Sequence, residues 1–239
     1  MQNLYLEANT LDQRAVDKYA LSEPLMMEHA ASAMAHYITE NFPKNSSILI
    51  VCGQGNNGND GRILGRQLQG EYRISHTYED GEHYDVVVDA LLGSGLNRPL
   101  DFSTQKLLDN LNGLDALKLA CDVPTGLYAS GMCDPHVFKA DLTITMGALK
   151  RSLFSDAAKE ITGNILVANL GITRSRYEVD TPWKLLDETD ICLPLRTKAA
   201  NHKGSYGHLA LVCGEHVGAA VLAGRDLMAA AQTGTGKTA

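Results

Sequence analysis

The five cysteines of the 239-residue chain are scattered, and no two of them form a CxxC pair. Their number is odd, and three of them lie inside apolar runs, where cysteine packs as a small core residue. A disulfide framework is therefore not expected, and neither is a cysteine metal site. This pattern is typical of a reducing compartment, so we expect a cytoplasmic protein.

Long hydrophobic runs and a basic excess are also missing. No apolar stretch approaches the ~18 residues of a membrane span. The first residues carry acids instead of the basic-then-apolar pattern of a signal peptide. The formal net charge is -7, so the surface as a whole should repel nucleic acid and anionic membranes. We therefore expect neither as a partner.

Apolar, β-branched runs alternate with helical patterns along most of the chain. Helices are predicted over 9–20, 24–41, 60–69 and 102–112, and strands over 46–52, 72–78, 84–92, 116–123, 142–146 and 165–169. Strands that alternate with helices indicate parallel crossover units. The fold class is therefore α/β: a Rossmann-like doubly wound, mostly parallel sheet with helices on both faces.

The character of the sequence changes after residue 175. Residues 176–195 are polar and mixed, which indicates a linker. A new apolar run with glycines follows, and the rest of the chain is too short to fold alone. We therefore predict one domain over 1–175, a linker over 176–195 and an incomplete α/β fragment over 196–239.

Three of the predicted strands end in polar loops, and ligands of a doubly wound sheet bind outside the carboxyl ends of its strands. The first loop reads GQGNNGNDG over 53–61. Its glycines would let the backbone approach a ligand, and the helix after it would offer free N–H groups to phosphate. The alternative is a tight turn in which Asn and Gly adopt positive φ angles.

The other two loops follow acidic side chains. Asp89 lies inside an apolar strand, where a carboxylate is costly unless it is paired, hydrogen-bonded or bound to a cation. Capping of the following loop is the alternative role. Asp122 ends a further apolar strand and can act as a general acid or base. The alternative there is a turn, which Asp and Pro both favour.

Together the three loops resemble the YjeF N-terminal domain family, whose best-known members are epimerases of hydrated NADH and NADPH, abbreviated NAD(P)HX. Four family motifs occur in order: GQGNNGNDG at 53–61, DALLGSGL at 89–96, DVPTG at 122–126 and ADLTITMGALK at 140–150. Asn59 stands where the family has glycine, which predicts a less open turn. The segment over 71–84 is shorter than in the family and is predicted to lack a helix.

The resemblance implies a role for each matching residue. Thirteen residues would hold the substrate: Asn56, Asn57, Gly58, Asn59, Asp60, Gly93, Ser94, Gly95, Leu96, Asn97, Arg98, Pro99 and Asp122. Asn57, Asp89 and Thr125 would coordinate a potassium ion, a hard cation that oxygen ligands suit. Asp122 would be the catalytic residue.

The implied reaction is epimerisation of the R and S forms of NAD(P)HX in cofactor repair. The hydroxyl on ring carbon 6 would leave as water, and water would return to the opposite face, with Asp122 as acid and base for both steps. We therefore expect an isomerase that works with an NAD(P)HX dehydratase. We also expect a homodimer formed through the two N-terminal helices.

Residues 196–224 resemble the opening of the ribokinase-like NAD(P)HX dehydratase domain, whose nucleotide and catalytic loops do not follow, so no dehydratase activity is expected. Residues 231–238 resemble a Walker-A loop, but only one residue follows them, and the phosphate cradle needs a helix there. Two alternatives stay open: a non-catalytic binding or scaffold module, and a fragment of a bifunctional epimerase and dehydratase.

Overall fold

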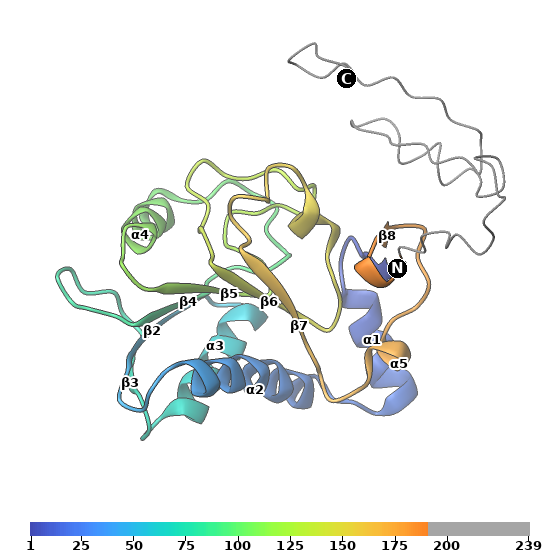
Figure 1. Ribbon diagram of the computed structural model, residues 1–239, viewed down its shortest axis with the longest axis horizontal. Helices are drawn as coiled ribbons and strands as arrows, with labels where there is room; N and C mark the ends of the chain where they lie inside the picture. Colours follow the sequence, from blue (N-terminus) through green and yellow to red (C-terminus); the bar gives the residue numbers. More distant parts are fainter. Residues whose placement is uncertain (191–239) are drawn as a thin grey trace, which may run out of the picture. The chain divides into compact units, whose positions relative to one another are not determined.

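The computed structural model describes residues 1–190, and a six-stranded parallel sheet is the centre of this part of the chain (Figure 1). The strand order is β3-β2-β4-β5-β6-β7, and every neighbouring pair is parallel. The strands are β2 Ser47–Cys52, β3 Arg73–Ser75, β4 Val86–Ala90, β5 Leu117–Cys121, β6 Leu142–Met146 and β7 Asn164–Ala168.

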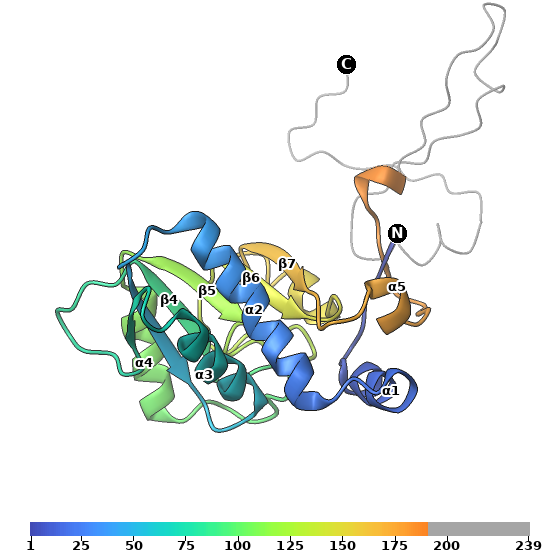
Figure 2. The ribbon, with the colours of Figure 1, turned by 90° about the horizontal axis from the view of Figure 1, so that it is seen from below.

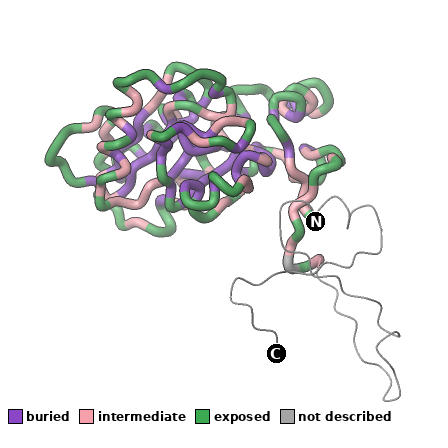
Figure 3. The backbone as a smooth tube through the Cα atoms, turned by 90° about the horizontal axis from the view of Figure 1, so that it is seen from above, coloured by how far each residue is buried: buried purple, intermediate pink, exposed green. Residues whose placement is uncertain are grey.

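Helices cover both faces of the sheet. α2 (Glu23–Asn41) and α3 (Asn56–Leu68) lie across one face, and α4 (Phe102–Asn112) lies on the other (Figures 1 and 2). Each helix buries an apolar side against the strands, and the buried residues gather along the sheet (Figure 3). The predicted Rossmann-like α/β fold is confirmed.

The predicted elements agree with the structure apart from their ends, and one end matters for the site. α3 begins at Asn56, four residues before the predicted start at 60. Most of the glycine-rich segment 53–61 is therefore the first turns of a helix. The predicted lack of a helix between β3 and β4 is confirmed, since residues 76–85 form a loop.

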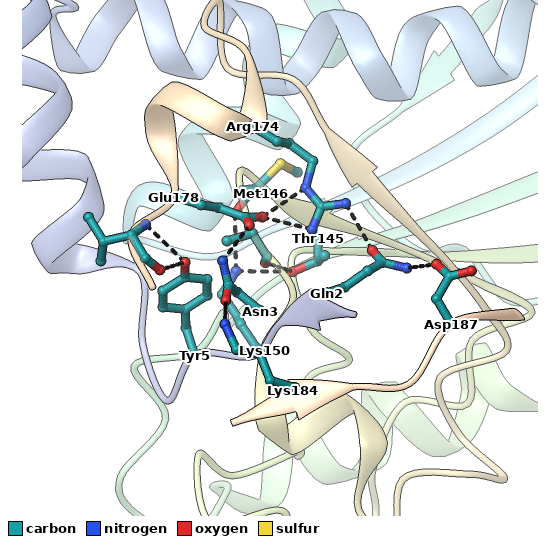
Figure 4. Close-up of polar contacts among 12 residues, drawn as sticks. Gln2, Asn3, Tyr5, Thr145, Met146, Lys150, Arg174, Glu178, Lys184 and Asp187 are labelled. Atoms are coloured by element: carbon teal, nitrogen blue, oxygen red, sulfur yellow. Dashed lines mark hydrogen bonds and ion pairs between the residues drawn. The ribbon is translucent and has the colours of Figure 1, made fainter. Parts of the chain in front are cut away.

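The N-terminal segment closes one end of the unit. β1 (Gln2–Asn3) pairs antiparallel with β8 (Lys184–Leu185), and α1 (Asn9–Tyr19) packs with α5 (Arg174–Tyr177) around the buried Tyr177 side chain. Side chains reinforce this pairing: Gln2 bonds Arg174 and Asp187, and Lys184 bonds Asn3 (Figure 4). Two short 3-10 helices complete the described elements, η1 Arg151–Phe154 and η2 Glu188–Asp190.

The compact unit therefore runs from Met1 to Glu188, beyond the predicted boundary at 175. The first part of the predicted linker belongs to this unit, because the buried Tyr177 and the β1–β8 pairing hold it there. The rest of the linker and the fragment predicted over 196–239 lie outside the described residues. Within 1–190, no helix is long and apolar enough to cross a membrane.

Candidate active site

A cleft of about 1280 Å³ lies at the carboxyl ends of β2, β4 and β5. The predicted residues that line it are Asn56, Asn57, Asp60, the seven residues of segment 93–99, and Asp122. The structure thus brings the three predicted loops to one place, as the Rossmann-like topology requires. Two helices also line the cleft, which the sequence analysis did not predict. α1 contributes Asp12 and Gln13, and α2 contributes Glu23, Met26 and Met27.

The N-terminus of α3 forms one side of the cleft. Gly55 is the capping residue, it offers no side-chain cap, and a Cβ atom there would meet nothing within 4 Å. The first backbone bond of the helix runs from the N–H of Asn59 to the oxygen of Gly55. The N–H groups of the preceding turn are therefore left for an anion, which the helix dipole also favours.

Gly58 and Asn59 do not line the cleft, unlike the other predicted residues of this loop. A Cβ atom on Gly58 would lie 1.9 Å from the backbone oxygen of Gly53, so the glycine permits a close backbone crossing. Asn59 is exposed on helical backbone and accepts a hydrogen bond from Arg62 at 2.9 Å. The prediction of a less open turn at Asn59 was wrong, because this position is already inside α3.

Asp122 follows β5 and turns its carboxylate into the cleft floor. Its backbone has φ = 70°, a left-handed conformation that is uncommon outside glycine and that Asp tolerates better than most residues. Burial alone would raise the pKa of its carboxyl group. The Lys150 ammonium at 2.6 Å and the N–H groups of Met146 and Ser94 outweigh burial, so the pKa of Asp122 is lowered.

Lys150 is the buried cation of the site. Its ammonium donates to Asp122 Oδ1, to Thr145 Oγ1 at 3.0 Å and to the oxygen of Met146 at 3.3 Å, which uses three donors on three acceptors. The residue is 1% exposed, and its surroundings appear in Figure 4. Sequence reasoning did not assign it to the site, although it ends the motif over 140–150.

Asp89 and Thr125 form a second buried polar pair just behind the cleft. Thr125 donates to Asp89 twice, at 2.7 Å from its N–H and at 2.7 Å from its Oγ1, and the Leu91 N–H adds a third bond at 3.1 Å. Burial raises the pKa of Asp89 to about 6 because these bonds only partly offset it. No lysine or arginine forms an ion pair with Asp89 in the described residues.

Two buried atoms near the α3 N-terminus have no hydrogen-bond partner in the described part of the chain: Asn57 Nδ2 and Asp60 Oδ1. Both residues line the cleft. Burial is the largest cause that raises the pKa of Asp60 to about 7, followed by the negative charges of Asp122, Asp12 and Glu23. Buried polar atoms are normally satisfied, so these two atoms indicate a place for a ligand.

A family profile described as YjeF-related protein N-terminus matches residues 23–83 and 71–152. The chain belongs to this family. The YjeF match covers the α3 N-terminus, Asp60, Asp89, Asp122 and Lys150, so the four YjeF motifs predicted from the sequence fall inside it. Its two segments meet over 71–83, on β3 and the loop after it, where the predicted helix-free connection lies.

Curated relatives support the same assignment. The chain is 31% identical over 207 residues to an NAD(P)H-hydrate epimerase of Elusimicrobium minutum, with 69% of this chain and 92% of that protein covered. It is 34% identical over 253 residues to the bifunctional NAD(P)H-hydrate repair enzyme Nnr of Helicobacter pylori, with 93% of this chain and 54% of that protein covered. The chain thus spans about half the length of the bifunctional relatives it matches.

A solved structure shares the YjeF fold seen here. The crystal structure of yeast YNL200c superposes with a TM-score of 0.59 at 16% sequence identity, covering 80% of this chain and 99% of the yeast chain. This likeness concerns the arrangement of helices and strands alone.

Proposed function

We propose that this chain is an NAD(P)H-hydrate epimerase that interconverts the R and S forms of hydrated NADH and NADPH. One observation carries the proposal: Asp122 lines the large cleft as a buried carboxylate that Lys150 keeps ionised. The names of its relatives supply the substrate class. The sequence alternative, a binding or scaffold module, has no need of a costly buried ion pair at the floor of its cleft.

Binding follows from the two polar edges of the cleft. The substrate carries a pyrophosphate, which suits the free N–H groups at the α3 N-terminus. The segment 93–99 lies on another edge and offers the exposed, cationic Arg98. A Cβ atom on Gly95 would meet nothing within 4 Å, so the ligand can approach the backbone there. The hydrated ring would then lie over the cleft floor at Asp122.

The sequence predicted Asp122 as acid and base for both steps; we propose it here as the general base, because its lowered pKa favours the ionised form. The hydroxyl on carbon 6 takes up a proton and leaves as water, helped by the ring-nitrogen lone pair, and a planar cation remains. Water then attacks carbon 6 from the other face, and the Asp122 carboxylate accepts a proton from it. Because its pKa is lowered, Asp122 is in the form required for this step at neutral pH.

We propose the potassium site that the resemblance implies, because the residues there suit a bound cation. Asp89 is a fully buried carboxylate bonded only by neutral donors, and such a group is stabilised by a cation. The buried Asn57 amide nitrogen has no partner within residues 1–190, and a flip of the amide would place its oxygen there as an ion ligand. Asn57, Asp89 and Thr125 would hold the ion, which would supply positive charge beside the cleft.

Two measurements test these proposals. The first mixes the R epimer of NADH hydrate with the protein, an S-specific dehydratase and ATP, and compares NADH formation with the protein-free rate of epimerisation. We expect acceleration that falls about 10²- to 10⁴-fold in Asp122→Asn. Asp115→Asn, a substitution of an exposed carboxylate outside the cleft, is the control. No acceleration by the folded wild-type protein would reject the epimerase.

The second measurement is thermal unfolding in KCl and in NaCl at equal ionic strength. Potassium should raise the melting temperature of the wild-type protein and should not raise that of Asp89→Asn, since binding to the native state alone is stabilising. Equal melting temperatures in the two salts would reject the ion. The homodimer, the cytoplasmic location and the cooperation with a dehydratase stay predictions.

A further inference from the structure

Asp60 is a buried carboxyl group of the cleft whose Oδ1 has no hydrogen-bond partner among residues 1–190. It lies in the first turns of α3, it is 8% exposed, and its Oδ1 accepts no hydrogen bond from the described residues. Its side chain lines the same cleft as Asp122. Burial without a hydrogen bond or a cation favours the protonated form of a carboxyl group.

The charges that face Asp60 from the surrounding elements are negative. Asp12 lies on α1, Glu23 on α2 and Asp122 at the end of β5, and all three raise the pKa of Asp60. The buried cation of the site, Lys150, is fully used by Asp122 and its neighbours. Asp60 and Asp122 therefore share one cleft, but their pKa values are shifted in opposite directions, so that at neutral pH Asp122 is ionised while a large share of Asp60 carries its proton.

Two further groups near Asp60 do not change this result. The Cys121 thiol is fully buried at the end of β5, and burial raises its pKa well above the ordinary value, so it carries no charge. Arg62, two residues later on α3, directs its guanidinium to the backbone oxygen of Gly53 at 2.6 Å and to Asn59. Neither group offers Asp60 a charge of opposite sign.

The stereochemistry of the proposed reaction favours one proton carrier on each face of the ring over a single residue that serves both steps. Inversion at carbon 6 removes a hydroxyl from one face of the ring and adds water to the other. Asp122 is fixed by Lys150 and by the N–H of Met146, so its carboxylate serves one face of a bound ring. When the environments of two carboxyl groups separate their protonation states, one is suited to act as acid and the other as base.

We infer that Asp60 is the catalytic proton donor of the epimerisation, acting across the substrate ring from Asp122. This inference rests on the proposed function. The carbon 6–oxygen bond breaks, its electron pair leaves with the oxygen, and the Asp60 proton converts that oxygen to water. The nitrogen lone pair forms a double bond to carbon 6. Water then adds, the double-bond electrons return to nitrogen, and Asp122 takes the released proton.

The step is balanced without any other reactant. One water leaves, one enters, and one proton has moved from Asp60 to Asp122. The opposite epimer uses the same two groups in reverse order, which restores the starting state, and exchange of protons with solvent does the same. The site with the proton on Asp60 therefore suits one epimer, and the site with the proton on Asp122 suits the other.

The test compares Asp60→Asn, Asp60→Glu and the surface control Asp115→Asn with the wild-type protein, from pH 5.5 to pH 9, on each epimer of NADH hydrate. Asp60→Asn keeps the shape and removes the proton. We expect its kcat to fall about 100-fold or more, with KM within about threefold and the alkaline decline of the rate abolished. Asp60→Glu should recover at least about tenfold over Asp60→Asn.

Three outcomes would overturn the inference. An Asp60→Asn variant that keeps its kcat across the pH range would show that the proton comes from elsewhere, while the epimerase itself stands. A loss confined to KM would assign Asp60 to binding. A folded wild-type protein that does not exceed the protein-free rate would reject the epimerase and the role of Asp60 together.

Discussion

The Lys150 ammonium lies 2.6 Å from Asp122 Oδ1, and both side chains are buried. The two residues come from the carboxyl ends of the adjacent parallel strands β5 and β6. Adjacent strands of a parallel sheet end side by side, so the fold itself brings the two charges together. This ion pair lowers the pKa of Asp122 and so keeps the carboxylate at the cleft floor ionised.

Removal of the cation should be costly for folding. Lys150→Met leaves the Asp122 carboxylate buried and unpaired, and we expect a loss of about 3–5 kcal/mol in the free energy of unfolding. Lys159→Met is the matched control, because Lys159 lies 2.5 Å from Asp156 on the exposed surface, where an ion pair contributes about 0–1 kcal/mol. Urea unfolding at pH 7 measures the free energy of unfolding of both variants. Equal losses would contradict this account of Lys150.

Asp60 should make stability depend on pH in a defined direction. Its pKa in the folded state is raised from 3.8 to about 7, so its stabilising contribution is complete below pH 4 and is lost as the pH rises through 7. Asp60→Asn cannot titrate and should gain stability relative to the wild type between pH 4.5 and pH 8, by up to about 4 kcal/mol. A stability difference that is constant with pH would contradict this prediction.

The bond from Thr125 to Asp89 should be stronger than a bond between neutral groups. Thr125→Val removes a hydroxyl donor to a buried carboxylate, with an expected loss of about 1.5–3 kcal/mol. Thr143→Val is the control, since its buried hydroxyl donates to the neutral oxygen of Thr162 at 2.7 Å and should cost about 0.5–1.5 kcal/mol. Chemical unfolding at pH 8 measures the free energy of unfolding of both variants. The reverse order would show that Asp89 is neutral in the folded protein.

Two glycines three residues apart should respond differently to a methyl group. Gly58→Ala places a Cβ atom against the backbone oxygen of Gly53 and should cost about 3 kcal/mol or more. Gly55→Ala meets nothing and should stay within about 1 kcal/mol of the wild type. Melting temperatures separate the two cases. Tolerance of Gly58→Ala would mean that the backbone crossing at Gly53 is looser than described.

Local patterns predicted the fold well because the central strands β2, β4 and β6 are largely buried on both faces and read as short apolar runs. β4, for example, is buried at all five of its residues. The same patterns placed Asp122 at a strand end, where the topology brings it to the cleft, and Asp89 inside a neighbouring strand, where it lies just behind the cleft. The local patterns did not predict contacts between residues that are far apart in the sequence. Lys150 meets Asp122 across 28 residues of sequence, and α1 reaches the cleft through its packing against α5.

The start of α3 shows a second way in which local sequence patterns failed to predict the structure. Glycine and asparagine are poor formers of helix interiors, so their density predicted a loop over 53–61. The close packing of Gly58 under Gly53 and of Gly61 against Ala90 overrides that preference. Asn59, read as a departure that narrows a turn, is an ordinary exposed helix residue.

The antiparallel pairing of β1 with β8 has a consequence for synthesis of the chain on the ribosome. Gln2 and Asn3 are made before their partners Leu185 and Lys184, which follow about 180 residues later, a delay of roughly 10–40 s at ~5–20 residues per second. Tyr5 likewise bonds Leu149 and Arg151 on either side of Lys150. The segment over 2–5 therefore cannot complete these contacts until the strands of the sheet, which precede residue 184, have been made.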